Sequence, residues 1–346
     1  MKAVIWEGVN KLRLDVNYPD PVCKEDWVIV KVMSVGICAT DTHIIRGKFN
    51  NGNPPGILGH EICGIITEIG SKVSSCRVGD RVVVETAIGC GDCIHCLTAN
   101  KHLCPDGSEI GFPPHDGGYA QFVTAPASCI HKIPDNMSYD EGGILEAMVC
   151  PFGAIYRYGM NIGETVLIQG TSIAGLSFLQ AVKLYSPKKV IVAARNPERL
   201  AEAQKYGADV IISTKNEDLT QRVMEETNGL GVSLSIDAAG SPETLENAVK
   251  LTGKGGRTIL YGLPGDDDQI QFPVKHMIMK QVTVIGVTNN ELAWDPLIDL
   301  VASGKVNAKD MVTHSFPIEK TEEAVKIATE RPVGFIKAVV HPWDEE

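Results

Sequence analysis

Short apolar runs, separated by turn-forming residues, dominate residues 1–150. The runs at 27–32, 64–69 and 80–85 are rich in valine and isoleucine, and polar residues interrupt them in partial alternation. Runs of this length bounded by Gly, Pro and Asn are typical of β-strands. The pattern predicts an all-β, barrel-like domain with long loops.

The pattern changes near residue 150, where continuous apolar runs begin to alternate with stretches of helical periodicity. The expected strands cover 165–169, 189–194, 210–212, 234–237, 257–261 and 282–286, and the clearest helices cover 173–185 and 197–206. Strands that alternate with helices of this length predict a parallel sheet with helices on both faces. Residues 292–346 return to mixed helix and strand and include an apolar run at 335–340.

Length and composition fit a globular protein of two domains. The chain has 346 residues, of which 44% are hydrophobic and 22% charged. It has no run of 18 apolar residues, and its first six residues lack the features of a signal peptide, so we expect a cytoplasmic protein with no membrane partner. The formal net charge of −11 disfavours nucleic acids and anionic membranes.

Four of the ten cysteines lie close together, as Cys90-x2-Cys93-x2-Cys96-x7-Cys104. Four thiolates at this spacing can surround one Zn²⁺ tetrahedrally and order a loop that has few apolar residues. An iron–sulfur cluster is an alternative, although ferredoxins have x3 before the last cysteine. Four unrelated buried cysteines are a further alternative. We predict a structural zinc site, closed because protein supplies all four ligands.

Three separated patches carry further candidate ligands: Cys38, His60 and Glu146. Each is weak evidence alone, because a single buried cysteine or histidine is usually structural. Together they supply a thiolate, an imidazole and a carboxylate, which is the set of three protein ligands expected of a catalytic zinc with an open position. Cys150, four residues after Glu146, is an alternative third ligand.

A glycine-containing turn follows the first expected strand of the central region. Between strand and helix the sequence reads Gly170-Thr171-Ser172-Ile173-Ala174-Gly175, in which Ser172 replaces the middle glycine of the dinucleotide fingerprint. The N-terminus of the following helix is suited to bind a pyrophosphate. The expected cofactor contacts are Gly170, Ser172, Ile173, Ala174 and Gly175.

The end of the second central strand bears on the choice of cofactor. NAD-binding proteins have an acidic residue there, whereas this chain has Ala194, followed by Arg195 and Arg199. Guanidinium groups bind a 2′-phosphate, which a carboxylate would repel. We therefore predict NADP(H) rather than NAD(H). Alternatively, Arg195 stacks on adenine without discriminating and Arg199 is a solvated helix residue.

Several motifs together resemble the zinc-containing medium-chain dehydrogenase/reductase family, in particular its sorbitol and threonine dehydrogenase branch. They are Gly-Ile-Cys-x-Thr-Asp-x-His at 36–43, Gly-His-Glu at 59–61 with Gly64, Val-Gly-Asp-Arg-Val at 78–82, and the four-cysteine lobe. The resemblance implies an α/β protein with a GroES-like, β-barrel-type catalytic domain over 1–150, completed by 292–346. It also implies a doubly wound, Rossmann nucleotide-binding domain over 151–291.

The resemblance also implies roles for individual residues. Cys38, His60 and Glu146 would hold a catalytic zinc, giving two zinc ions per chain, and Glu61 would lie beside the metal and exchange with water as a ligand. Thr40 would pass a proton to His43, whose ordinary pKa is near neutral, and Asp41 would fix the tautomer of His60. The alternatives are a turn-capping Thr40, a helix-capping Asp41 and a solvent-facing His43.

Substrate, further cofactor contacts and assembly follow from the same resemblance. It places Gly262 and Thr288 near the nucleotide, although they could serve only tight strand exits. A polar metal site suggests oxidation of a polyol, sugar or sugar acid at a secondary alcohol; threonine-like amino alcohols and simple alcohols are alternatives. A nucleotide-binding reductase that lacks catalytic zinc is an alternative of another class. Family members commonly form homodimers or homotetramers, and the run at 282–286 could be an edge or an internal strand.

Overall fold

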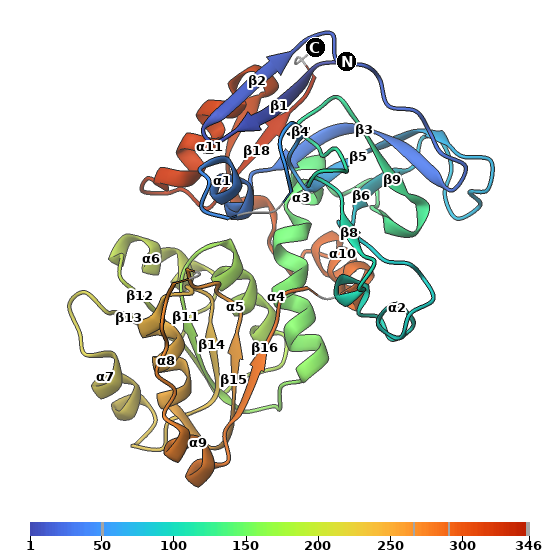
Figure 1. The fold of residues 1–346 in the computed structure, drawn as a ribbon. Coiled ribbons are helices and arrows are strands. Elements are labelled where there is room, and N and C mark those ends of the chain that lie inside the picture. Colours follow the sequence, from blue (N-terminus) through green and yellow to red (C-terminus); the bar gives the residue numbers. More distant parts are fainter. Residues whose placement is uncertain (50–51, 266, 290, 344–346) are drawn as a thin grey trace. The chain divides into compact units, whose positions relative to one another are not determined.

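The computed structural model describes residues 1–49, 52–265, 267–289 and 291–343 and forms two compact units (Figure 1). The first unit comprises Met1–Val149 and Asn290–Glu346, and the second comprises Cys150–Asn289. The second unit is therefore inserted into the sequence of the first. Within the described ranges, no helix combines the length and the apolar character needed to cross a membrane.

The first unit is built mainly of β-strands. Its strands are β1 (Ala3–Gly8), β2 (Lys11–Asp15), β3 (Trp27–Gly36), β4 (Gly56–Ile57), β5 (Glu61–Ile69), β6 (Arg81–Val84), β7 (Ala87–Ile88), β8 (Ser108–Glu109), β9 (Phe122–Pro126), β10 (Ile130–Lys132), β17 (Val312–Pro317) and β18 (Lys337–His341). The largest sheet has the order β10-β6-β5-β3-β18-β17, with β9 paired to β3, and smaller sheets join β2-β1-β4 and β7-β8. Their inner faces enclose one apolar core.

Short helices connect these strands. The α-helices of the first unit are α1 (Ala39–Ile45), α2 (Ile94–Leu97), α3 (Tyr139–Gly143), α10 (Trp294–Ala302) and α11 (Thr321–Glu330), and its 3₁₀ turns are η1 (Lys101–Leu103), η2 (Ala127–Cys129), η3 (Glu291–Ala293), η4 (Lys309–Met311) and η5 (Ile318–Lys320). Helix α4 (Leu145–Tyr158) begins in the first unit and ends in the second.

The strand β18 completes the central sheet from late in the sequence. It runs antiparallel beside β3, with Val339 opposite Gly36 and Val340 opposite Val35. Both strands are almost fully buried. The strand β18 therefore belongs to the core of the first unit, next to the strand that leads into Cys38.

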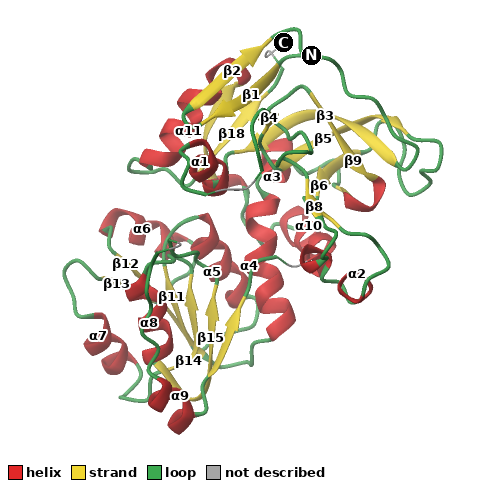
Figure 2. Cartoon of the chain, in the orientation of Figure 1, coloured by secondary structure: helices red, strands yellow, loops and turns green. Residues whose placement is uncertain are grey.

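The second unit is a six-stranded parallel sheet with helices beside it (Figure 2). Its elements are β11 (Thr165–Gln169), α5 (Ile173–Lys183), β12 (Lys189–Ala194), α6 (Pro197–Lys205), β13 (Val210–Ser213), α7 (Leu219–Glu226), β14 (Val232–Asp237), α8 (Pro242–Lys250), β15 (Thr252–Leu260), α9 (Val274–Lys280) and β16 (Thr283–Gly286). The order β13-β12-β11-β14-β15-β16 is that of a doubly wound dinucleotide-binding sheet. The predicted parallel α/β arrangement is confirmed.

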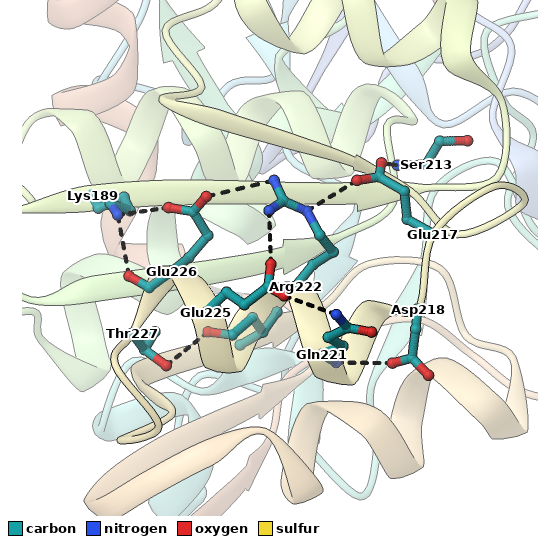
Figure 3. Close-up of polar contacts among 10 residues, drawn as sticks. Lys189, Ser213, Glu217, Asp218, Gln221, Arg222, Glu225, Glu226 and Thr227 are labelled. Carbon is teal, nitrogen blue, oxygen red and sulfur yellow. Dashed lines mark hydrogen bonds and ion pairs between the residues drawn. The ribbon is translucent and has the colours of Figure 1, made fainter.

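Polar contacts fix α7 to the sheet of the second unit (Figure 3). Lys189, the first residue of β12, lies 2.7 Å from the carboxylate of Glu226 at the end of α7. Arg222, one turn earlier, contacts Glu217 at 2.9 Å and Glu225 at 3.1 Å. These ion pairs are partly exposed, so we assign them to orientation of the helix and assign stability to the apolar cluster beneath.

The strand β16 lies at the edge of this sheet. It pairs with β15 from Thr283 opposite Arg257 to Gly286 opposite Leu260, and in the described ranges it has no second neighbour. Of the two possibilities open from the sequence, edge or internal strand, the structure shows an edge strand.

Candidate metal centres and nucleotide site

Helix α1 positions the first candidate ligand. Cys38 is its N-terminal cap, and the Cys38 backbone N–H donates a 3.1 Å hydrogen bond to the Asp41 carboxylate. The Tyr119 hydroxyl donates a second bond, of 2.8 Å, to the same oxygen. At Gly36, just before this turn, a Cβ atom would overlap the Glu61 carboxylate and lie 2.7 Å from the Gly143 carbonyl oxygen. Only glycine allows β3 to pass so close to Glu61.

His60 is buried between Asp41 and Glu146. Its Nδ1 lies 3.2 Å from the other oxygen of Asp41, and its Nε2 lies 3.9 Å from the Glu146 carboxylate. Its ring lies against Phe112, with centroids 4.8 Å apart. Burial alone would lower the pKa of His60, but the negative charges of Asp41 and Cys38 hold it well above the usual value. Asp41 both caps α1 and faces His60, so the two roles considered for it are compatible.

Glu61 and Lys337 form a buried ion pair. The Lys337 Nζ donates to Glu61 Oε1 at 2.5 Å, and the exposed fractions of the two side chains are 4% and 0%. Burial alone would lower the pKa of Lys337, but the charges of Glu61, Cys38 and Glu146 raise it above the usual value. Sequence reasoning missed Lys337. A lysine within the apolar run at 335–340 was the feature of the sequence that could have indicated a buried charged residue.

Cys38, His60 and Glu61 bring their ligand atoms within 4.8 Å of one another. Glu146 approaches from α4 but lies outside this tightest group. Burial, reinforced by the charge of Glu61, raises the pKa of Glu146 to about 7. The sequence analysis expected Glu61 to lie beside the metal ligands. In the structure it is one of the three residues whose ligand atoms lie closest together.

The donor set of this cluster suits zinc. It combines sulfur, nitrogen and oxygen, which are the ligand types of catalytic zinc sites. The second carboxylate oxygen of Glu61 is buried and accepts no hydrogen bond from any described residue. A cation among these groups would satisfy that oxygen and compensate the clustered negative charge.

The proposed proton carriers lie along α1. Thr40 is its second residue and is half-buried, and His43, one turn later, is exposed. Partial loss of water and the cations Lys48, Arg331 and Arg46 lower the pKa of His43. Cys150, the alternative ligand, is buried, and its thiol donates to the Asn289 side chain within the second unit.

The four cysteines of the lobe also converge. The ligand atoms of Cys90, Cys93, Cys96 and Cys104 lie within 4.8 Å of one another, and none of the four forms a disulfide. Backbone N–H groups point at the sulfurs, from Cys90 to Cys104 at 3.4 Å and from Cys93 to Cys90 at 3.3 Å. Such bonds stabilise thiolates, so the lobe suits a closed tetrahedral metal site.

In the second unit, the turn after β11 has the geometry of a nucleotide-binding loop. Gly170 has a φ of +115°, and a Cβ at Gly175 would overlap the Gly170 carbonyl oxygen. These are the roles of the first and third fingerprint glycines, a tight turn and close packing of helix on strand. Ser172 is the N-terminal cap of α5, which starts at Ile173 and continues with Ala174. Its hydroxyl makes no capping bond.

The remaining cofactor candidates lie after other strands of the same sheet. Arg195 is exposed beyond β12, whereas Arg199 is half-buried in the first turn of α6 and its backbone N–H donates to the Asn196 side chain. Gly262 follows β15, and Thr288 is exposed after β16.

Asp237, at the end of β14, is a residue of the nucleotide site that the sequence analysis did not single out. Its buried carboxylate accepts backbone bonds from Ala239 at 3.3 Å and Gly240 at 3.0 Å, and burial raises its pKa. It therefore organises the turn at the topological switch point of the sheet.

Comparison with known families gives two matches. The alcohol dehydrogenase GroES-like domain matches residues 24–135, and the zinc-binding dehydrogenase domain matches residues 174–303. Sorbitol dehydrogenase of Bacillus subtilis is 32% identical over 345 residues, covering 99% of this chain and 97% of the relative. D-arabitol-phosphate dehydrogenase of Enterococcus avium is 33% identical over 315 residues, covering 90% of this chain and 88% of the relative.

Solved structures agree with this result. An alcohol dehydrogenase of Escherichia coli CFT073 complexed with NADH has a TM-score of 0.92 and 28% identity. A putative zinc-binding dehydrogenase of Sinorhizobium meliloti bound to NADP has a TM-score of 0.91 and 28% identity. Each comparison covers 99% of both chains. The predicted pair of a GroES-like domain and a Rossmann domain is confirmed.

Proposed function

The chain belongs to the zinc-containing medium-chain dehydrogenase/reductase family, in its sorbitol (polyol) branch, and we propose that this oxidoreductase transfers a hydride between NADP(H) and a polyol or sugar at a secondary alcohol. The observation that carries the proposal is the convergence of Cys38, His60 and Glu61, with Glu146 beside them. This buried, polar cluster of sulfur, nitrogen and oxygen donors suits a hydroxyl-rich substrate. We propose Cys38, His60 and Glu146 as the ligands of a catalytic zinc. Glu61 would exchange with water as a further ligand.

When bound, zinc supplies Lewis-acid chemistry, which lowers the pKa of an alcohol hydroxyl and polarises a ketone. The surrounding residues orient the ligands. The Asp41 carboxylate lies 3.2 Å from His60 Nδ1 and would orient the ring so that Nε2 is the ligand atom, and Tyr119 and the Cys38 backbone hold Asp41 in place. The positive charge of Lys337 neutralises the charge of the Glu61 carboxylate, which reduces the net negative charge of the cluster.

The proton released from the substrate hydroxyl must reach water. Thr40 and His43 are one helical turn apart on α1, which places both side chains on the same face of the helix. We propose that the Thr40 hydroxyl passes the proton to His43. The exposed His43, with its lowered pKa, is then largely unprotonated at neutral pH and accepts a proton readily.

The test of this function is metal content together with substrate screening. Atomic emission analysis should find two zinc ions per chain, one in each cluster. The zinc-loaded protein should reduce NADP⁺ in the presence of sorbitol, xylitol, D-arabitol or galactitol. One zinc per chain and no oxidation of any alcohol would instead indicate a reductase-like protein without catalytic metal.

We propose that Arg195 selects NADP(H). Arg195 is exposed and comes directly after Ala194, which occupies the position where an acidic residue would hold the ribose of NAD. A charged hydrogen bond to phosphate is worth about 1.5–3 kcal/mol. Arg195→Ala should therefore lower kcat/KM for NADP⁺ by about 10- to 100-fold while changing that for NAD⁺ less than about three-fold.

Steady-state kinetics with both cofactors gives these values. Lys254→Ala, which removes an exposed positive charge from β15 of the same unit, is the control and should leave the ratio unchanged. A ten-fold preference of the unmodified enzyme for NAD⁺ would overturn the assignment.

We propose that residues 1–150 with 292–346 form the catalytic domain and residues 151–291 the nucleotide domain, in a cytoplasmic homodimer or homotetramer. The open edge of β16 supports association through the second unit, because an unpaired edge strand can be extended by a second copy. Ser172, the first turn of α5 and the exits at Gly262 and Thr288 would contact the nucleotide.

A further inference from the structure

An open cavity of about 340 Å³ lies in the first unit beside the candidate catalytic site. Lys101, His102, Ser108, Glu109 and Phe112 contribute to its wall. Phe112 belongs to both places, because its ring also lies against His60. A cavity of this volume is large enough for a small polar ligand.

Glu109 is the residue of this wall that lacks a partner. It ends β8, where its backbone pairs with Ala87, and its side chain is half-buried. In the part of the chain that the structure describes, its carboxylate forms no hydrogen bond and no ion pair. The segment that follows Glu109 reaches the metal cluster, because a Cβ atom at Gly111 would lie 2.9 Å from the Cβ of His60 and the Phe112 ring packs on the His60 ring. Glu109 is therefore close enough to the metal cluster to influence what binds there.

The cation in the same wall is already compensated. Lys101 Nζ lies 2.7 Å from the buried Glu85 carboxylate and 3.9 Å from that of Glu291. Ser108, next to Glu109, shares a 3.0 Å hydrogen bond with His115. The cavity thus presents one unpaired carboxylate and no unpaired cation among these residues. An ionised carboxylate only accepts hydrogen bonds, so its natural partners are hydroxyl groups of a ligand.

We propose that Glu109 determines specificity by accepting hydrogen bonds from the hydroxyl groups of an uncharged polyol, beyond the carbon that reacts. The same carboxylate repels a phosphate or carboxylate on the substrate, so phosphorylated polyols and sugar acids are excluded. This inference rests on the proposed function and narrows its substrate class. It separates this chain from relatives that act on polyol phosphates.

The experiment compares kcat/KM for two matched sets of substrates. The first set pairs each of the polyols sorbitol, xylitol, D-arabitol and galactitol with its terminal phosphate ester. The second set pairs the same polyols with 2-butanol, which has no further hydroxyl groups. The unmodified enzyme should prefer the best polyol over its ester by about 100-fold or more, since two like charges in a partly desolvated site repel strongly.

Two variants separate charge from hydrogen bonding. Glu109→Gln should reduce the preference for polyol over ester by at least about ten-fold, mainly by accelerating the ester. Glu109→Leu should lower the ratio of kcat/KM for the polyol to kcat/KM for 2-butanol by about 10- to 100-fold. Glu68→Gln, which removes an exposed negative charge elsewhere in the first unit, should change neither ratio.

Calorimetric titration of the zinc-loaded protein with the polyol gives a readout independent of turnover. Glu109→Leu should weaken the polyol Kd by about ten-fold or more. The inference is overturned if the unmodified enzyme prefers a phosphate ester or L-threonine, or if both Glu109 variants keep the original ratios and Kd. Failure of the proposed function looks different, because no alcohol would then be oxidised while the polyol Kd still reports on Glu109.

Discussion

Replacing Glu146 by alanine is expected to lower kcat/KM for alcohol oxidation by at least about 1000-fold and to reduce the zinc content from two ions per chain to about one. Lewis-acid stabilisation by a bound metal is worth several kcal/mol, and each 1.4 kcal/mol is about ten-fold in rate. The side chain lies 3.9 Å from His60 Nε2 near the start of α4, outside the strands of the first unit. The fold should therefore survive the substitution.

Two variants test whether Glu146 acts as a ligand. Glu146→Cys keeps a metal-binding donor and should recover part of the zinc and of the activity, whereas Glu146→Ala should recover neither. Cys150→Ser should retain the zinc and the activity, because the Cys150 thiol donates a hydrogen bond to the Asn289 side chain. If Glu146→Ala turned over normally and Cys150→Ser did not, the third ligand would be Cys150.

The second large effect concerns stability. Lys337→Met should lower the free energy of unfolding of the metal-free protein by about 3–5 kcal/mol, because it leaves Glu61 as a buried charge without its counter-ion. Denaturant unfolding followed by circular dichroism measures this difference. The metal-free protein is the right sample, since a bound cation would partly replace the lysine.

The double variant Glu61→Gln with Lys337→Met provides the control. It removes both charges, so it should be more stable than Lys337→Met alone by at least about 2 kcal/mol. Lys326→Met, at an exposed position on α11, should change stability by less than about 0.5 kcal/mol. Equal stability of the single and double variants would show that the buried pair is not coupled.

Local spacing made the cysteine lobe and the parallel sheet predictable. The four cysteines lie within fifteen residues, so their sequence spacing nearly fixes their geometry, and the alternation of strand and helix predicts a parallel sheet. The edge position of β16 needed the structure, because an apolar run does not report how many neighbours it has.

The partners of the metal cluster were not predictable by the same means. Lys337 and Glu61 are 276 residues apart, and Tyr119 and Asp41 are 78 apart, so no local pattern connects them. A lysine in an apolar strand contradicts the hydrophobic pattern, and such contradictions are where functional groups are expected. Glu109 gave no signal at all, since a glutamate in a two-residue strand is ordinary until its surroundings are known.

The insertion of the second unit between the two parts of the first has a consequence for biosynthesis. As the ribosome elongates the chain, the segment that carries Cys38, His60 and Glu61 emerges long before Lys337. Domains generally fold as units, so the second unit can fold before β18 is available to pair with β3. Glu61 then gains its lysine only after most of the polypeptide has been translated, so the buried ion pair forms late in the maturation of the chain.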